Sequence, residues 1–100
     1  MRTVWTPLGL KSLGKTTNFI EEQWNKDVAD NFLDRLDERI EQLKRNPKIG
    51  PTYEQTEFRQ LLIHPHVTLY YELKTDHLIL TLVWANKQDP DELRKELKRV

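Results

Sequence analysis

The sequence predicts a small α+β protein in which an antiparallel helical hairpin packs on a four-stranded, largely antiparallel sheet. Two observations carry this prediction. Apolar residues recur at helical spacing through the first half of the chain, and the spacing becomes strand-like after about residue 56. With 100 residues, the chain suits one domain over 1–100 with a single modest core.

A short strand and a helix are expected first. Val4 and Trp5 suit an extended edge element, and Thr6 followed by Pro7 reads as a helix start, because threonine caps well and proline fits the first turn. The helix is expected to run from Pro7 to about Trp24. Its predicted apolar stripe contains Leu10, Leu13, Thr17, Ile20 and Trp24.

A second helix is predicted from Asn25 to Asn46. Proline at position 47 ends it, because the residue before a proline avoids helical backbone angles. The short break between the two helices implies a hairpin. The apolar stripe of the second helix contains Val28, Phe32, Leu33, Leu36, Ile40 and Leu43.

Three strands joined by short turns should follow, at Phe58–Ile63, Val67–Leu73 and Leu78–Ala85. Strict alternation in the last strand would place Leu78, Leu80, Leu82 and Trp84 on one face and Ile79, Val83 and Ala85 on the other. A strand that is apolar on both faces should be central. A charged helix is expected over Pro90–Val100. The sheet face away from the hairpin then needs a cover, either another chain or this helix, and we expect a second polypeptide to contribute.

Composition excludes several classes of protein. Sixteen basic residues balance sixteen acidic ones, whereas a protein that grips a polyphosphate backbone usually carries a basic excess. The chain has no cysteine, which excludes disulfides and cysteine-ligated zinc. No apolar run has the length of a signal peptide or a membrane span. We therefore expect a cytoplasmic protein with no membrane partner and no cofactor.

His64 and His66 flank Pro65 between two predicted strands. A metal ion would need a third ligand, and none lies nearby in sequence. His77 falls in the next turn, which should lie at the opposite end of the sheet. The pair is best interpreted as a bend, and no metal site is predicted.

Several segments together resemble the RelE/ParE toxin superfamily of bacterial type II toxin–antitoxin systems. They are VWTPLGLKSL, IEEQWNKDVADNFLDRLDERIEQLKRNPKIG, FRQLLIHPHVTLYYEL and LILTLVWANKQDP. The resemblance covers nearly the whole chain. It implies a growth-inhibiting, plasmid-stabilising toxin with a cognate antitoxin as its protein partner.

The superfamily resemblance leaves two activities open. RelE-like members cut messenger RNA on the ribosome with basic residues and a tyrosine or histidine near the C-terminus, whereas ParE-like members poison DNA gyrase. Here the tail reads Trp84-Ala85-Asn86-Lys87-Gln88, without tyrosine or histidine. The resemblance therefore favours the ParE-like branch, with gyrase as the target. A ribonuclease, with ribosome-bound RNA as its partner, and an inactive antitoxin-binding protein remain alternatives.

Arg59 matches the arginine that the family carries on its second strand, and Glu72 or Glu57 would be its partner. One of Tyr70 and Tyr71 should be core and the other should reach the rim of the sheet. The residues predicted to contact a target are Arg59, Tyr71, Trp84 and Lys87. If the chain is instead a ribonuclease, its candidate catalytic residues are Arg59, His64, His66 and Lys87.

Overall fold

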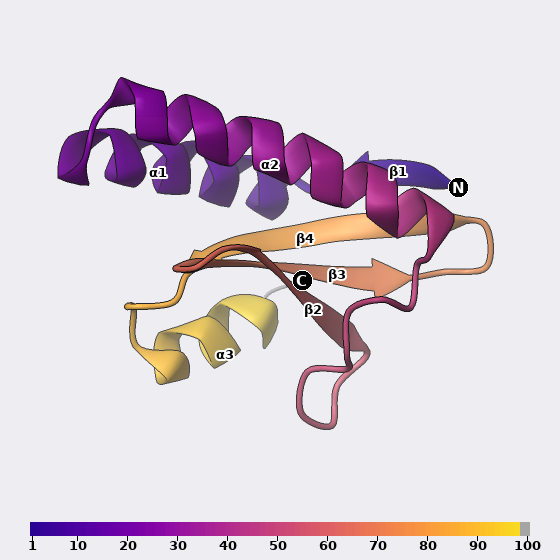
Figure 1. Ribbon diagram of the computed structural model, residues 1–100. Helices are drawn as coiled ribbons and strands as arrows, with labels where there is room; N and C mark the ends of the chain where they lie inside the picture. The colour runs from indigo at the N-terminus through magenta and orange to yellow at the C-terminus, as the bar shows by residue number, and fades with distance from the viewer. Residues whose placement is uncertain (99–100) are drawn as a thin grey trace.

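The computed structural model describes residues 1–98 and confirms the predicted α+β architecture. Two helices, α1 (Pro7–Gln23) and α2 (Lys26–Arg45), lie together on one side of a four-stranded sheet, and α3 (Pro90–Lys98) lies on the other (Figure 1). The strands are β1 (Arg2–Trp5), β2 (Phe58–His64), β3 (Val67–Leu73) and β4 (His77–Ala85). The last two residues of the helix expected over Pro90–Val100 lie outside the described part.

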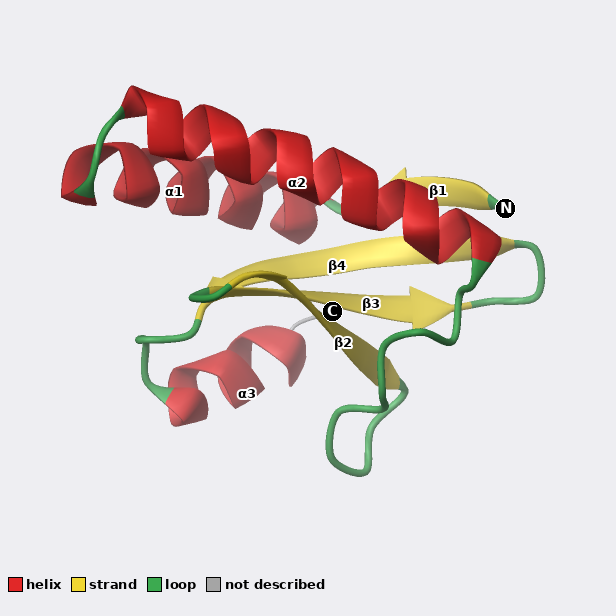
Figure 2. Ribbon diagram, in the orientation of Figure 1, coloured by secondary structure: helices red, strands yellow, loops and turns green. Residues whose placement is uncertain are grey.

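The sheet has the order β1-β4-β3-β2, so β4 is central as predicted. β2, β3 and β4 form an antiparallel meander, and β1 pairs in parallel with the first half of β4, from Arg2 opposite His77 to Trp5 opposite Leu80. The long connecting loop of the described chain lies between α2 and β2, and the other connections are short (Figure 2). Among the described helices none is long and apolar enough to cross a membrane.

The face pattern predicted for β4 is wrong. A β-bulge at Thr81 shifts the register, so that Tyr71 lies opposite Leu80 and Tyr70 opposite Leu82. An extra residue in one strand reverses the alternation beyond it. Leu78, Leu80 and Val83 therefore join the core under the hairpin, while Leu82 and Trp84 join a second core on the opposite face.

The buried face of α1 also differs from the predicted stripe. Ile20 of the predicted stripe is buried and Leu13 packs against the core, as expected. Leu10, however, is 56% exposed and Trp24 45% exposed, and α1 also buries Gly9, Ser12 and Thr16. Small residues face the sheet because α1 approaches β4 very closely. A Cβ placed on Gly9 would lie 2.4 Å from the carbonyl oxygen of Leu80. By contrast α2 follows its prediction, with Phe32, Leu36 and Leu43 fully buried.

Thr6 fixes the start of α1 to the bulge. Its hydroxyl accepts from the amide of Gly9 at 2.9 Å, which caps the helix, and donates to the carbonyl of Thr81 at 3.2 Å. Its own amide donates to the carbonyl of Leu80 at 3.1 Å. The helix N-terminus and the irregular point of the central strand are thus tied to each other.

The sheet face away from the hairpin is largely covered by the chain itself. Leu93 and Leu97 of α3 pack with Tyr53, Tyr70, Leu82 and Trp84 in the second core. The expectation that a second polypeptide is needed to shield this face is therefore wrong for most of it. The charged C-terminal segment supplies the cover because its two leucines, four residues apart, fall on one side of a helix.

We predict that Gly9→Ala destabilises the fold by about 1–3 kcal/mol, because the added methyl group meets backbone that is held by hydrogen bonds. Gly14→Ala is the matched control on the same helix. A Cβ there meets nothing, so the substitution should leave stability unchanged or raise it by up to about 1 kcal/mol. Chemical denaturation of both variants measures the difference. Equal stabilities would contradict the close approach of α1 to β4.

Candidate functional site

Arg59 lies at the start of β2 and holds the loop that precedes the strand. Its Nη1 donates to the carbonyl of Gly50 at 2.8 Å, not to Glu72 or Glu57 as expected from the sequence. Glu72 pairs instead with Lys74 at 3.0 Å. Arg59 is half-buried, because the loop folds back along the outer edge of β2 and covers it.

The fold-back is a short continuation of the sheet. The amide of Tyr53 donates to the carbonyl of Phe58 at 2.8 Å, and the amide of Gln60 donates to the carbonyl of Pro51 at 2.9 Å. Residues 51–53 therefore satisfy the outward-facing backbone groups at the beginning of this edge strand, which would otherwise be open to association with another chain.

Tyr71 secures the same loop from beneath. Its hydroxyl accepts from the amide of Gly50 at 3.1 Å and donates to the carbonyl of Pro47 at 2.8 Å. Only glycine fits at position 50, because a Cβ would lie 2.5 Å from the carbonyl oxygen of Gln60. Tyr71 is 0% exposed, so in this conformation it supports Arg59 and offers no surface to a target.

Tyr70 is also buried, which differs from the prediction that one tyrosine would reach the rim. It lies on the other face, where its ring meets that of Tyr53 edge-on at 5.1 Å beneath α3. Burial, together with the nearby Tyr53 and Glu54, raises the pKa of Tyr70 to about 12. Its phenol therefore stays neutral at physiological pH and behaves as part of the second core.

The bend that the sequence indicated is formed by Pro65 and His66, directly after His64 ends β2, and an aromatic cluster lies beside it. The ring of His66 stacks on that of Trp24 at 6.2 Å, and Phe19 packs edge-on against Trp24 at 6.5 Å. Burial, His66 and Arg35 lower the pKa of His64. In the described chain no three metal-ligating side chains come together, at the histidine pair or elsewhere.

Lys87 joins this end of the sheet. It lines a small hollow of about 10 Å³ with Trp24, His64 and His66, which has room for about one water molecule. Arg59 lies at the far end of β2, five residues before His64, a strand distance of about 17 Å. The four candidate catalytic residues are therefore divided between two ends of the sheet.

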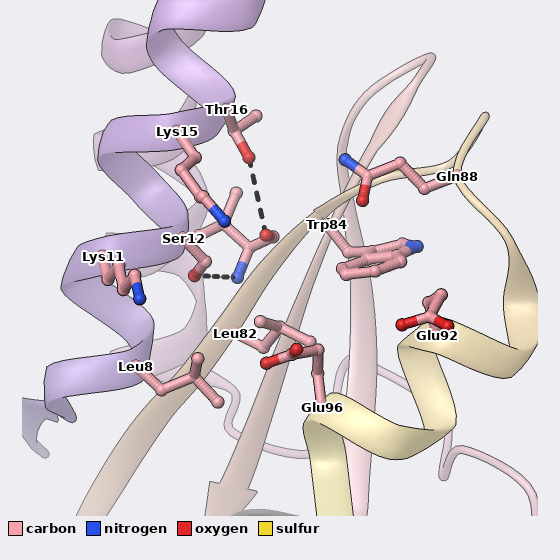
Figure 3. A pocket seen from close by; sticks show the side chains of 11 residues that line it. Leu8, Lys11, Ser12, Lys15, Thr16, Leu82, Trp84, Gln88, Glu92 and Glu96 are labelled. Atoms are coloured by element: carbon pink, nitrogen blue, oxygen red, sulfur yellow. Dashed lines mark hydrogen bonds between the residues drawn. The ribbon is translucent and has the colours of Figure 1, made fainter.

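Trp84, the remaining predicted contact residue, lines a cleft with a volume of about 650 Å³ (Figure 3). The cleft separates α1 from α3. Leu8 and Leu82 complete its apolar floor, and Trp84 itself is only 8% exposed.

Charged side chains of opposite sign line the two walls of this cleft. Lys11 and Lys15 come from α1, and Glu92 and Glu96 come from α3 (Figure 3). Sequence reasoning did not find these four residues, because it did not place α1 and α3 beside one another. One signal was present: Gly9, Ser12 and Thr16 are small residues that recur at helical spacing in α1.

The class of protein is a RelE/ParE-like α+β fold. It is defined by the helical hairpin, the mixed four-stranded sheet and the pinned loop, which is the segment 47–53 held by Tyr71 and Arg59. One solved structure, titled "Chromosomal ParDE TA system from P. aeruginosa", superposes with a TM-score of 0.71. The match covers 85% of this chain and 95% of that chain at 14% sequence identity, so it bears on the fold alone. Comparison with curated proteins gave no match.

Residues 3–90 match the family described as "ParE toxin of type II toxin-antitoxin system, parDE". The chain belongs to this family. The match includes the strand-to-helix opening, the hairpin, the pinned loop and the whole meander, and therefore confirms the family resemblance found in the sequence.

We predict that Tyr71→Phe destabilises the protein by about 1–3 kcal/mol, because it leaves the amide of Gly50 and the carbonyl of Pro47 without their partner. Hydrogen exchange should accelerate first in residues 47–53. Tyr70→Phe is the control, since within residues 1–98 its hydroxyl has no hydrogen-bond partner, and it should cost less. If Tyr71→Phe leaves both stability and loop exchange unchanged, the hydroxyl does not hold the loop.

Proposed function

We propose that the protein is a growth-inhibiting toxin that binds DNA gyrase in its bacterial host and that a cognate antitoxin neutralises it in the cytoplasm. The observation that carries this proposal is the family match over residues 3–90. The fold, which is similar to that of a chain from a ParDE system, agrees with this family match.

The arrangement of the charged residues supports action by binding. General acid–base catalysis requires its groups to converge on one reacting centre within hydrogen-bond reach. Arg59 is bonded to Gly50 at one end of β2, while His64, His66 and Lys87 gather at the other end. This separation favours gyrase binding over the RelE-like cleavage of ribosome-bound messenger RNA.

Lys87 and Arg59 are the polar groups that we assign to target contact. Lys87 is exposed beside the aromatic rings of Phe19 and Trp24, and aromatic side chains surrounded by a polar rim are typical of protein interfaces. Arg59 also holds residues 50–53 in place. Part of its contribution to target binding therefore comes from the position that it gives this loop.

We predict that induced expression in a bacterial host arrests growth and induces the DNA-damage response. Purified protein should inhibit supercoiling by gyrase and accumulate cleaved DNA, because a poison stabilises the cleaved intermediate. Primer-extension mapping of messenger RNA is the control. Codon-phased cuts would support the ribonuclease instead, and harmless expression of folded protein would support an inactive family member.

Variants then separate contact residues from supporting ones. Lys87→Ala should weaken gyrase inhibition several-fold, whereas Lys26→Ala, at the exposed N-terminal end of α2, should not. Arg59→Ala should lower toxicity while leaving antitoxin binding largely intact. If Tyr71→Phe lowers toxicity as much as Arg59→Ala does, Arg59 acts only by holding the loop. Full toxicity of Lys87→Ala and Arg59→Ala at normal protein levels removes both from the interface.

A further inference from the structure

The chain covers parts of both edges of its own sheet. On one side β1 ends opposite Leu80 while β4 continues to Ala85, so the second half of β4 has no strand along its outer edge. There α1 substitutes for a strand, because the hydroxyl of Ser12 accepts from the amide of Val83 at 2.9 Å (Figure 3). On the other side, residues 51–53 cover only the first half of β2.

Two arginines from α2 cover the second half of β2. The Nε of Arg35 donates to the carbonyl of Ile63 at 2.7 Å. The Nε of Arg39 donates to the carbonyl of Leu62 at 3.1 Å, and its Nη1 donates to the side chain of Gln42 at 2.6 Å. The two arginines are four residues apart, so they lie on one side of the helix. In the described part of the chain neither arginine pairs with a carboxylate, and both are directed to the strand instead.

A β-bulge explains how two consecutive carbonyls of β2 can meet the same helix. The register between β2 and β3 moves from Leu62 opposite Thr68 to His64 opposite Val67, which leaves Ile63 as an extra residue. Consecutive carbonyls of a regular strand point to opposite sides, but a bulge breaks this alternation. Both carbonyls therefore come within reach of α2.

Without the arginines this part of β2 would be suited to pair with another strand. Leu62 is 53% exposed, and its neighbours Leu61 and Ile63 belong to the core. An apolar edge strand with open carbonyl groups is a template for association with further strands. A second copy of this chain carries the same edge, so two copies can pair antiparallel about a two-fold axis.

We propose that Arg35 and Arg39 close the second half of the β2 edge and so prevent two copies of this chain from pairing strand to strand. The guanidinium groups act in two ways. They occupy the carbonyl acceptors that a second strand would need, and they carry a charge that persists at physiological pH. Pairing about a two-fold axis would bring the arginines of both copies together, and like charges at an interface weaken binding. This role of α2 does not depend on which target or antitoxin the protein binds.

The double variant Arg35→Ala, Arg39→Ala tests this role, because it frees both carbonyls and removes the charge. It should associate with itself at least about 10-fold more tightly than the unmodified protein, as measured by sedimentation velocity over a range of concentrations. Hydrogen exchange should then show new protection in residues 61–64. The matched control Lys26→Ala, Arg45→Ala removes the same charge from exposed positions of the same helix and should behave as the unmodified protein does.

A further substitution separates pairing at the edge from a general loss of solubility. Adding Leu62→Lys to the double variant restores a charge to this edge at an exposed position, and should return the association to the level of the unmodified protein. If the double variant is folded by circular dichroism and associates no more than the unmodified protein, the arginines do not close the edge. If Leu62→Lys leaves the association unchanged, the copies meet elsewhere and the proposal fails.

A measurement on the unmodified protein decides the question if the double variant does not fold. In nitrogen-15 NMR the Nε–H groups of Arg35 and Arg39 should exchange with solvent at least about 10-fold more slowly than that of Arg45, because hydrogen bonding protects an N–H group. Arg45 is exposed, and within the described chain its side chain has no hydrogen-bond partner. Equal exchange of all three groups would show that the arginines do not cover the strand.

Discussion

The close contact between the start of α1 and the middle of β4 is the constraint on which the rest of the structure depends. Gly9 allows the helix to approach the backbone of Leu80, and Thr6 joins the helix cap to the bulge at Thr81. The bulge then sends Leu82 and Trp84 to the face opposite Leu80. One contact thus fixes the position of the hairpin and also divides the apolar residues of β4 between two cores.

Two cores on a sheet of this size require a cover on each side, and the chain provides both. The hairpin covers one face with large residues from α2 and small residues from α1, and α3 covers the other with two leucines. At the unpaired part of β4 the two covers leave a cleft between them, with apolar residues at its floor and charges on its walls.

Much of the fold was predictable from the sequence because local signals agreed with tertiary packing. The spacing of Phe32, Leu36 and Leu43 predicted the buried face of α2, and Asn25 and Pro47 marked its ends. The β2–β3–β4 meander followed from strand-like runs separated by turn residues. In each case one element's own pattern was sufficient.

The errors occurred where the structure depends on contacts between distant residues. The bulge at Thr81 is stabilised by Thr6, which is 75 residues away, so alternation within β4 could not reveal it. The same holds for Arg59, whose partner is the backbone carbonyl of Gly50 and not a carboxylate. Charge pairing can be proposed from residue types, but a backbone acceptor supplied by a folded loop cannot. The cleft was not predicted for a related reason. Its two walls, α1 and α3, are far apart in sequence.

The role of α1 as a substitute edge strand is tested most directly by the exchange rate of the Val83 amide hydrogen. This amide is the donor to the hydroxyl of Ser12 beyond the end of β1. The account predicts slow exchange, comparable to that of the paired amides of β3, and selective loss of protection in Ser12→Ala while the β3 amides stay protected. Fast exchange at Val83 in the unmodified protein would show that α1 does not complete the edge of the sheet.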